Sequence, residues 1–290
     1  MLLRELAGGG NAFPSGGLTV ITRRRFCAIS GGVLVSSAAG ACRFADETRE
    51  GNDGRLTARP RENVEASAKL ERALGLDPAR DAFLQLPMTA TRAPMPLVVL
   101  FHGAGQSAEW MLHRLGSAAD EAAVAVLAPN SRASSWDAIR DGFGPDVSFL
   151  NRALERVFES VTIDPTRIAA GGFSDGATYA LSLGLINGDL FSRVVAFSPG
   201  FLVAGTARGT PRFFISHGTG DRILPIDRCS RRIVRGLRER GYDVTFREFD
   251  GGHEVPDDIA LEGMRCVAGG STAEQPRASH WTGLEYESRT

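Results

Sequence analysis

The chain reads IAAGGFSDGA over residues 168–177, and this stretch decides the predicted fold. It contains a G-x-S-x-G pattern formed by Gly172, Ser174 and Gly176, between a short apolar run and a helical segment. A serine in a tight strand-to-helix turn exposes its hydroxyl, and glycines two residues to either side avoid clashes in such a turn. The pattern is common by itself, but its place between a strand and a helix predicts that Ser174 is a nucleophile.

Short apolar runs alternate with amphipathic segments on both sides of this turn. The runs are bounded by turn residues, which is typical of strands. Strands separated by helices indicate an α/β fold with a mostly parallel central sheet and helices on both faces. The expected strands are 82–86, 97–101, 123–127, 167–170, 194–197, 213–216 and 244–249. The expected helices are 147–161, 178–186 and 229–237.

Two polar side chains follow strands downstream of the serine. His253 lies in a glycine-rich loop after the last strand, where an imidazole can reach the serine and take its proton. Asp221 follows the preceding strand, and a buried carboxylate there would fix the imidazole tautomer and stabilise the imidazolium. Asp250 is the alternative carboxylate, but its closeness to His253 in the chain would require an awkward local bend. These positions predict a catalytic triad of Ser174, Asp221 and His253.

The loop after the strand at 97–101 carries the sequence HGAGQ, residues 102–106. It has neither the GxGxxG pattern of dinucleotide-binding folds nor the GxxxxGK pattern of phosphate-binding loops. Beside a nucleophilic serine, such a loop donates one backbone N–H to the oxyanion, and the residue after the serine donates the other. We therefore expect the N–H groups of Ala104 and Asp175 to form an oxyanion hole.

Four segments together resemble the phospholipase/carboxylesterase family of α/β-hydrolases, which are serine esterases. They are VVLFHGAG (98–105), IAAGGFSDGA (168–177), SHGTGDRILP (216–225) and FDGGHEVP (249–256). The resemblance covers residues 80–262 and implies an α/β-hydrolase fold, hydrolysis of small-molecule carboxylic esters or thioesters, and no cofactor. Most such enzymes have Gln after the nucleophile, where this chain has Asp175. The backbone donor survives this change, but the added carboxylate could alter pH dependence or the preferred substrate charge.

The stretch between Ser198 and Arg212 is too short for the lid or cap domain that many lipases insert there. We therefore expect an open active site without a cap domain, which favours water-soluble esters or accessible polymer ends over activation at a lipid interface. The aromatic and apolar residues expected to line the substrate pocket are Trp110, Met111, Phe173 and Phe201.

The composition excludes several classes of protein. The 33 basic and 34 acidic side chains give a net charge of −1, so the basic surface of a nucleic-acid-binding domain is not expected. With 43% hydrophobic and 23% charged residues, the chain is globular rather than wholly disordered. No cysteine or histidine cluster has the spacing of a metal site. Cys229 and Cys266 either form a disulfide or remain two buried thiols.

Residues 1–41 have the parts of an export signal. Arg23-Arg24-Arg25-Phe26 precedes a weakly apolar run from Cys27 to Ala41 and resembles the twin-arginine signal. A membrane-spanning helix needs about 20 apolar residues, so no stable transmembrane span is expected here. Small residues before Cys42 also resemble a lipoprotein processing site, which makes Cys42 a candidate lipid anchor. We expect an exported protein, either periplasmic or extracellular, or a membrane-anchored lipoprotein.

The chain is thus divided into an export signal (1–41), a linker (42–78), an α/β-hydrolase domain (79–267) and a flexible tail (268–290). The favoured function is carboxylic-ester hydrolysis through an acyl-enzyme. Two alternatives use the same triad, an exported polyester depolymerase and a feruloyl-type esterase, and they differ only in substrate. A third alternative is an inactive periplasmic binding protein on this fold, for which an intact triad would be needless. No oligomeric state is predicted.

Overall fold

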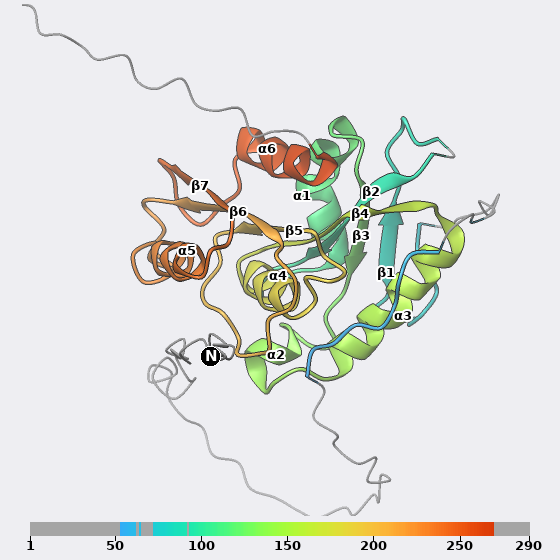
Figure 1. Cartoon of the computed structure of the whole chain (residues 1–290), viewed down its shortest axis with the longest axis horizontal. Coiled ribbons are helices and arrows are strands. Elements are labelled where there is room, and N and C mark those ends of the chain that lie inside the picture. Colours follow the sequence, from blue (N-terminus) through green and yellow to red (C-terminus); the bar gives the residue numbers. More distant parts are fainter. Residues whose placement is uncertain (1–52, 62–63, 65–71, 92, 270–290) are drawn as a thin grey trace, which may run out of the picture.

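The computed structural model describes residues 53–61, 64, 72–91 and 93–269. Within them, one seven-stranded sheet has the order β1-β3-β2-β4-β5-β6-β7 (Figure 1). Only β1 is antiparallel to its neighbour, and the other adjacent pairs are parallel. Every expected strand is present, and the mostly parallel sheet is confirmed. The strands are β1 Ala82–Gln85, β2 Met95–Phe101, β3 Ala125–Pro129, β4 Ile163–Phe173, β5 Arg193–Phe197, β6 Arg212–Gly218 and β7 Val244–Phe249.

Helices cover both faces of this sheet. Apolar residues of α3, α4 and α5 form one core cluster with the sheet, and those of α1 and α6 form a second cluster on the other face (Figure 1). The expected helices correspond to α3, α4 and α5, and no bounds were predicted for the others. The helices are α1 Ala108–Glu121, α2 Asp137–Arg140, α3 Pro145–Ser160, α4 Asp175–Ile186, α5 Ser230–Glu239 and α6 Asp257–Ala268.

The strand register brings the motif loops to one edge of the sheet. Phe101 at the end of β2 pairs with Gly172 of β4, and Gly218 at the end of β6 pairs with Phe249 of β7. Because these strands are parallel, their carboxyl ends lie at the same edge, where ligands bind in open α/β sheets. The segment between β5 and β6 contains neither a helix nor a strand, so no cap domain interrupts this edge.

Residues 53–61 belong to the predicted linker, yet they pack on the domain. Leu56 is 1% exposed and its N–H donates to Asn187 Oδ1 at 2.9 Å. Arg55 forms an ion pair with Asp189 at 2.7 Å. The domain was predicted to begin at residue 79. The structure adds this upstream segment to it, bound at the end of α4. Residues 1–41, predicted to be an export signal, Cys42 and the predicted tail after Gly269 lie outside the described residues.

The two cysteines of the domain are free thiols, so the disulfide alternative is excluded. Cys229 precedes α5 and Cys266 lies on α6, and these helices cover opposite faces of the sheet. Burial raises the pKa of each thiol to about 11, so neither is reactive at neutral pH. In the part of the chain that the structure describes, no helix has the length and apolar character needed to cross a membrane.

Candidate active site

Ser174 occupies the sharp turn between β4 and α4. Its backbone has φ 57° and ψ −119°, an unusual conformation for a residue other than glycine. A Cβ on Gly176 would lie 1.9 Å from Phe101 O, and one on Gly172 would lie 2.5 Å from the Gly176 backbone. The glycines of the G-x-S-x-G pattern therefore let α4 start against β2, and this close approach holds the serine in its exposed turn.

The structure brings Ser174, His253 and Asp221 together. His253 Nε2 lies 2.9 Å from Ser174 Oγ, and His253 Nδ1 lies 2.6 Å from Asp221 Oδ2. In this arrangement the serine hydroxyl donates to Nε2 and the Nδ1–H donates to the carboxylate. Of the two candidate carboxylates, Asp221 contacts the imidazole, whereas Asp250 is exposed.

Asp221 is buried and accepts hydrogen bonds at both oxygens. Its Oδ1 accepts from the N–H groups of Ile223 and Leu224, each at 2.8 Å. Burial opposes ionisation of this carboxyl, but the Leu224 N–H and His253 outweigh burial and hold its pKa below the ordinary value. Asp221 is therefore an anion at neutral pH, as stabilising an imidazolium requires.

His217 is a second imidazole on the same carboxylate, and no role was predicted for it from the sequence. It is fully buried at the end of β6, with Nε2 2.7 Å from Leu224 O and 3.1 Å from Asp221 Oδ2. Its Nδ1 lies 2.6 Å from Ser230 Oγ. Burial lowers the pKa of His217, so the ring is neutral, with Nε2–H as donor and the Ser230 hydroxyl donating to Nδ1. The sequence feature that could have indicated this role is its position four residues before Asp221, in the same loop motif.

The expected oxyanion donors lie on the other side of the nucleophile. A Cβ built on Gly103 would be 3.4 Å from Ser174 Cβ, so the loop after β2 packs against the serine. Among the residues that the structure describes, the N–H groups of Ala104 and Asp175 donate to no protein acceptor. Asp175 begins α4, where N–H groups are unsatisfied and the helix dipole favours an anion. Both groups are therefore free to bind a developing oxyanion.

Comparisons with known proteins show which sequences and folds this chain is similar to. Residues 146–260 match the model of the phospholipase/carboxylesterase family. The predicted family resemblance is confirmed. The chain is 31% identical over 147 residues to NocK of Nocardia uniformis subsp. tsuyamanensis, a protein that carries an esterase name. This match covers 47% of the chain and 42% of NocK.

A second relative of the hydrolase domain is acyl-protein thioesterase 1 of Gibberella zeae, 28% identical over 133 residues, with 41% of the chain and 54% of the relative covered. The chain thus spans about half the length of these curated relatives. Among solved structures, the esterase PE8 has 22% identity and a TM-score of 0.51, covering 63% of the chain and 97% of PE8. The domain has the α/β-hydrolase fold.

Asp175, where this chain departs from the family pattern, is held by a neighbouring loop. Ser135 Oγ donates to Asp175 Oδ2 at 2.5 Å, and Ser135 is buried. The adjacent Ser134 accepts at its carbonyl oxygen from the Gly105 N–H at 2.7 Å. Gly105 follows Ala104, so these two serines connect the loops that carry both oxyanion donors.

Replacing Ser135 by alanine is expected to lower kcat about tenfold on any ester that the protein hydrolyses, with KM changed less than about twofold. The reason is that Asp175 loses the hydrogen bond that fixes the start of α4 beside the oxyanion. Steady-state kinetics check this. Ser134→Ala is the matched control, because Ser134 uses only its carbonyl oxygen, and it is expected to behave as wild type. Equal effects of the two substitutions would contradict the argument.

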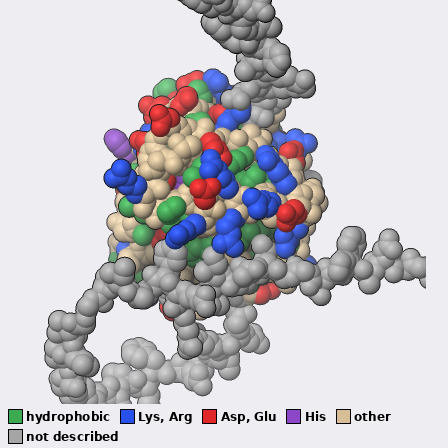
Figure 2. Space-filling view, turned by 90° about the vertical axis from the view of Figure 1, so that its left-hand side faces the viewer, with side chains coloured by type: hydrophobic (Ala, Val, Ile, Leu, Met, Phe, Trp, Pro, Cys, Tyr) green, Lys and Arg blue, Asp and Glu red, His purple; other side chains and the backbone are tan. Residues whose placement is uncertain are grey.

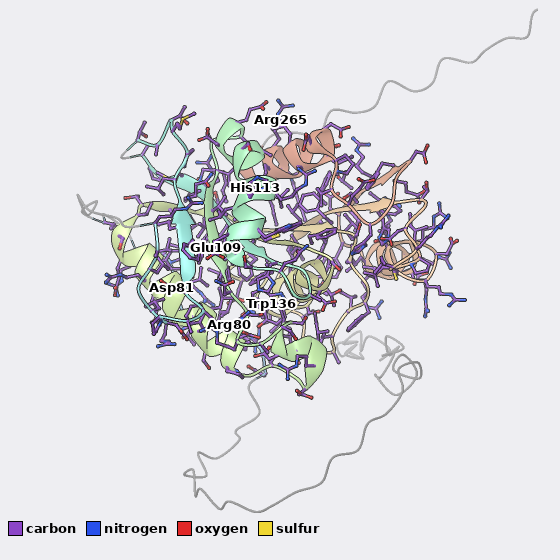
Figure 3. The ribbon with its side chains drawn as sticks, turned by 180° about the vertical axis from the view of Figure 1, so that it is seen from behind. Arg80, Asp81, Glu109, His113, Trp136 and Arg265 are labelled. Carbon is purple, nitrogen blue, oxygen red and sulfur yellow. The ribbon has the colours of Figure 1, made fainter. Side chains whose placement is uncertain are left out.

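The loop that carries these serines is anchored from behind. Trp136 is 1% exposed and its Nε1–H donates to His102 O at 2.8 Å. Arg80 donates to Ala133 O at 2.7 Å (Figure 3 labels Trp136 and Arg80). Both hydrogen bonds join the loop to residues that precede it in the chain. Several independent contacts therefore fix the loop beside the nucleophile.

Two buried carboxylates, Asp137 and Asp146, bind the backbone at both ends of the same loop. Asp146 accepts from the N–H groups of Arg132 and Asp137, at 2.5 and 2.7 Å. Asp137 accepts in return from the N–H groups of Asp146 and Gly144, each at 2.8 Å. Burial raises the pKa of Asp146 to about 6 against the opposing Arg132 N–H, and the charge of Asp137 adds to the rise. Asp146 is therefore a carboxylate that ionises at a free-energy cost.

Asp146→Asn is expected to gain stability relative to wild type as the pH rises from 4 to 7, by about 2 kcal/mol. Between the ordinary pKa of 3.8 and the raised value of about 6, the folded chain binds more protons than the unfolded chain. Stability due to this group therefore falls as the pH rises through that window, and asparagine cannot ionise. Urea unfolding at several pH values measures the difference, with Asp250→Asn as an exposed control. Parallel pH curves for wild type and Asp146→Asn would contradict it.

The four expected pocket residues divide into three groups. The ring of Trp110 stacks on that of Phe173 at 5.8 Å, and Phe173 lies 4.8 Å from the His253 ring, so both belong to the site. Met111 is fully buried in the core. Phe201 is 37% exposed and lies at a separate groove beside α5.

Proposed function

We propose that this chain is a serine hydrolase that cleaves carboxylic esters of small molecules through an acyl-enzyme. The observation that carries the proposal is the chain of contacts from Ser174 Oγ through His253 to Asp221, at 2.9 and 2.6 Å, beside two unpaired backbone N–H groups. The family match and the esterase names of the relatives support the same class. A binding protein would have no need for this complete set.

In the first half of the proposed reaction, His253 Nε2 takes the proton of Ser174 Oγ while Oγ forms a bond to the ester carbonyl carbon. The N–H groups of Ala104 and Asp175 hold the resulting oxyanion, and each such donor contributes about 3 kcal/mol to barrier lowering. Asp221 stabilises the imidazolium. Collapse of the intermediate breaks the bond to the alcohol oxygen, which leaves with the proton from Nε2.

In the second half, a water molecule gives a proton to His253 Nε2 and attacks the acyl carbon. The same two N–H groups bind the second oxyanion. Its collapse breaks the bond to Ser174 Oγ, which recovers the proton, and the carboxylic acid leaves. In each half, His253 Nε2 accepts one proton, from Ser174 or from water, and then gives it to the leaving oxygen.

The open edge of the sheet favours esters that are soluble in water. No cap lies between β5 and β6, and the Asp175 carboxylate places negative charge beside the nucleophile. We therefore expect neutral or cationic alcohol groups to be preferred over anionic ones.

The test uses p-nitrophenyl esters from acetate to palmitate. Turnover preceded by a burst of about one p-nitrophenol per chain is expected for an acyl-enzyme. A fluorophosphonate should label Ser174 and stop turnover, as mass spectrometry of the peptide would show. A protein that is inert on the whole series and is not labelled would overturn the proposal and favour a binding protein.

Export remains part of the proposal and is supported by the sequence alone. Arg24→Lys with Arg25→Lys is expected to move the protein from the exported to the cytosolic fraction of expressing cells. Cys42→Ala is expected to release it from the membrane fraction if Cys42 carries a lipid. Unchanged fractionation of both variants would remove the export signal and the anchor from the proposal.

A further inference from the structure

The segment that occupies the place of a cap is fastened along α4. The Val203 N–H donates to Ser182 Oγ at 3.0 Å. Further on, the Arg208 N–H donates to Leu185 O at 2.8 Å. Held by these hydrogen bonds, residues 200–207 form a wall along α4.

A groove lies between this wall, α4 and α5, and we call it the α5 groove. Its volume is about 480 Å³, within the range of small-molecule sites. None of the triad residues lines it. Its apolar lining is formed by Leu185, Ile186, Leu202, Val203, Ile233 and Leu237.

Three arginines line the groove, namely Arg228, Arg232 and Arg240, and the Arg240 guanidinium donates to Gly236 O at 2.9 Å. Arg228 and Arg232 are exposed, and neither forms an ion pair with any residue that the structure describes. Their neighbour Arg231 differs, since it pairs with Glu248 at 2.6 Å and with Asp227 at 2.8 Å. Figure 2 views the side of the molecule on which α5 lies and shows Arg side chains beside hydrophobic ones, with some Asp and Glu side chains among them. The rim is therefore positively charged and has its donors available.

We propose that the α5 groove binds an amphiphile made of an alkyl chain and an anionic head group. The chain lies along the apolar lining, where burial of apolar surface contributes about 25 cal/mol per Å². The head group, a carboxylate or a phosphate, accepts from the guanidinium groups of Arg228 and Arg232, which can each offer two parallel donors. A cationic head group would meet like charge at the same place.

The α5 groove contains none of the proposed catalytic residues, but hydrogen bonds connect its lining to the nucleophile. Gly200, which lines the groove, donates its N–H to Thr178 Oγ1 at 2.9 Å. The Thr178 N–H in turn donates to Ser174 O, so Gly200 contacts a residue one turn of α4 from the nucleophile. Binding in the groove requires no ester bond, so it holds whether or not the esterase proposal does.

Calorimetry on the full chain tests the proposal with three ligands of equal chain length. Decanoate and decyl phosphate are expected to bind at one site per chain, and decyltrimethylammonium about tenfold more weakly, all below their micelle concentrations. Comparison of the first two shows which anionic head the groove prefers. Equal affinity for the anions and the cation, or no saturable binding of any, would overturn the proposal.

Variants of exposed arginines locate the site without disturbing the core. Arg228→Gln with Arg232→Gln is expected to weaken decanoate binding about tenfold and to reduce the discrimination against the cation. Arg235→Gln is the matched control, because Arg235 is exposed on the same helix but does not line the groove. A loss with Arg235→Gln as large as with the double variant would assign the effect to general charge and overturn the site. Heat of binding is independent of ester turnover, so failure of one proposal is distinguishable from failure of the other.

Discussion

Ser174→Ala is expected to abolish ester turnover, with kcat falling about 10⁵-fold. The substitution removes the Oγ that lies 2.9 Å from His253 Nε2, and no other hydroxyl among the described residues contacts that imidazole nitrogen. Alanine at this position keeps the backbone turn, so the fold and the free oxyanion donors remain. Steady-state turnover of the best p-nitrophenyl ester, corrected for spontaneous hydrolysis, measures the change.

Two controls separate loss of chemistry from loss of structure. Thermal unfolding of Ser174→Ala is expected within a few degrees of wild type, since a small hydroxyl in a half-buried turn is removed. Ser134→Ala changes an exposed serine on the neighbouring loop and is expected to retain full turnover. If Ser174→Ala kept more than about a hundredth of wild-type kcat, a different nucleophile would be required.

The strands were predictable because their sequences are apolar runs with clear ends. The parallel order then determined that Ser174, Asp221 and His253 reach the same edge, since each follows the carboxyl end of a strand. The triad geometry thus needed only local motifs and the general rule for α/β sheets. The bounds of β3 were shifted because Ala123, with φ 55°, turns the chain out of α1 before the strand begins.

Helix α6 shows why some helices could not be predicted from their own sequence. Gly263 interrupts its apolar stripe, and glycine is an unfavourable residue inside a helix. The structure explains this residue, because a Cβ there would lie 2.9 Å from the Phe197 ring. The glycine lets α6 pack closely on the sheet, a reason that exists only after the chain has folded.

Long-range partners were also beyond the reach of sequence patterns. Ser135 and Asp175 are 40 residues apart, and Arg55 and Asp189 are 134 apart, so neither pair leaves a spacing to recognise. Polar residues 53–61 were assigned to a linker because their one large apolar side chain, Leu56, gives no periodicity. Their packing depends on ion pairs such as Arg55–Asp189 and on the buried Leu56, whose N–H is bound by Asn187 at the end of α4.

Asp221→Asn is expected to lower kcat about 10⁴-fold with little change in KM. The amide can turn its NH₂ toward His253 Nδ1, which stabilises the tautomer whose Nε2 carries the proton and cannot accept one from Ser174. The neutral amide also fails to stabilise the imidazolium. Steady-state kinetics at constant pH measure the loss. A decrease of less than about tenfold would remove Asp221 from the triad and return Asp250 to consideration.

A double-mutant cycle with His217 tests how this carboxylate is held. Because His217 Nε2 lies 3.1 Å from the same Asp221 Oδ2 that contacts His253, His217→Gln alone is expected to lower kcat about tenfold. In the Asp221→Asn background the same substitution should have almost no further effect, since the oriented anion is already gone. Ser230→Ala, which removes only the hydroxyl bound to His217 Nδ1, should produce a smaller loss of the same kind. Additive losses across the cycle would mean that His217 supports the fold rather than the position of the Asp221 carboxylate.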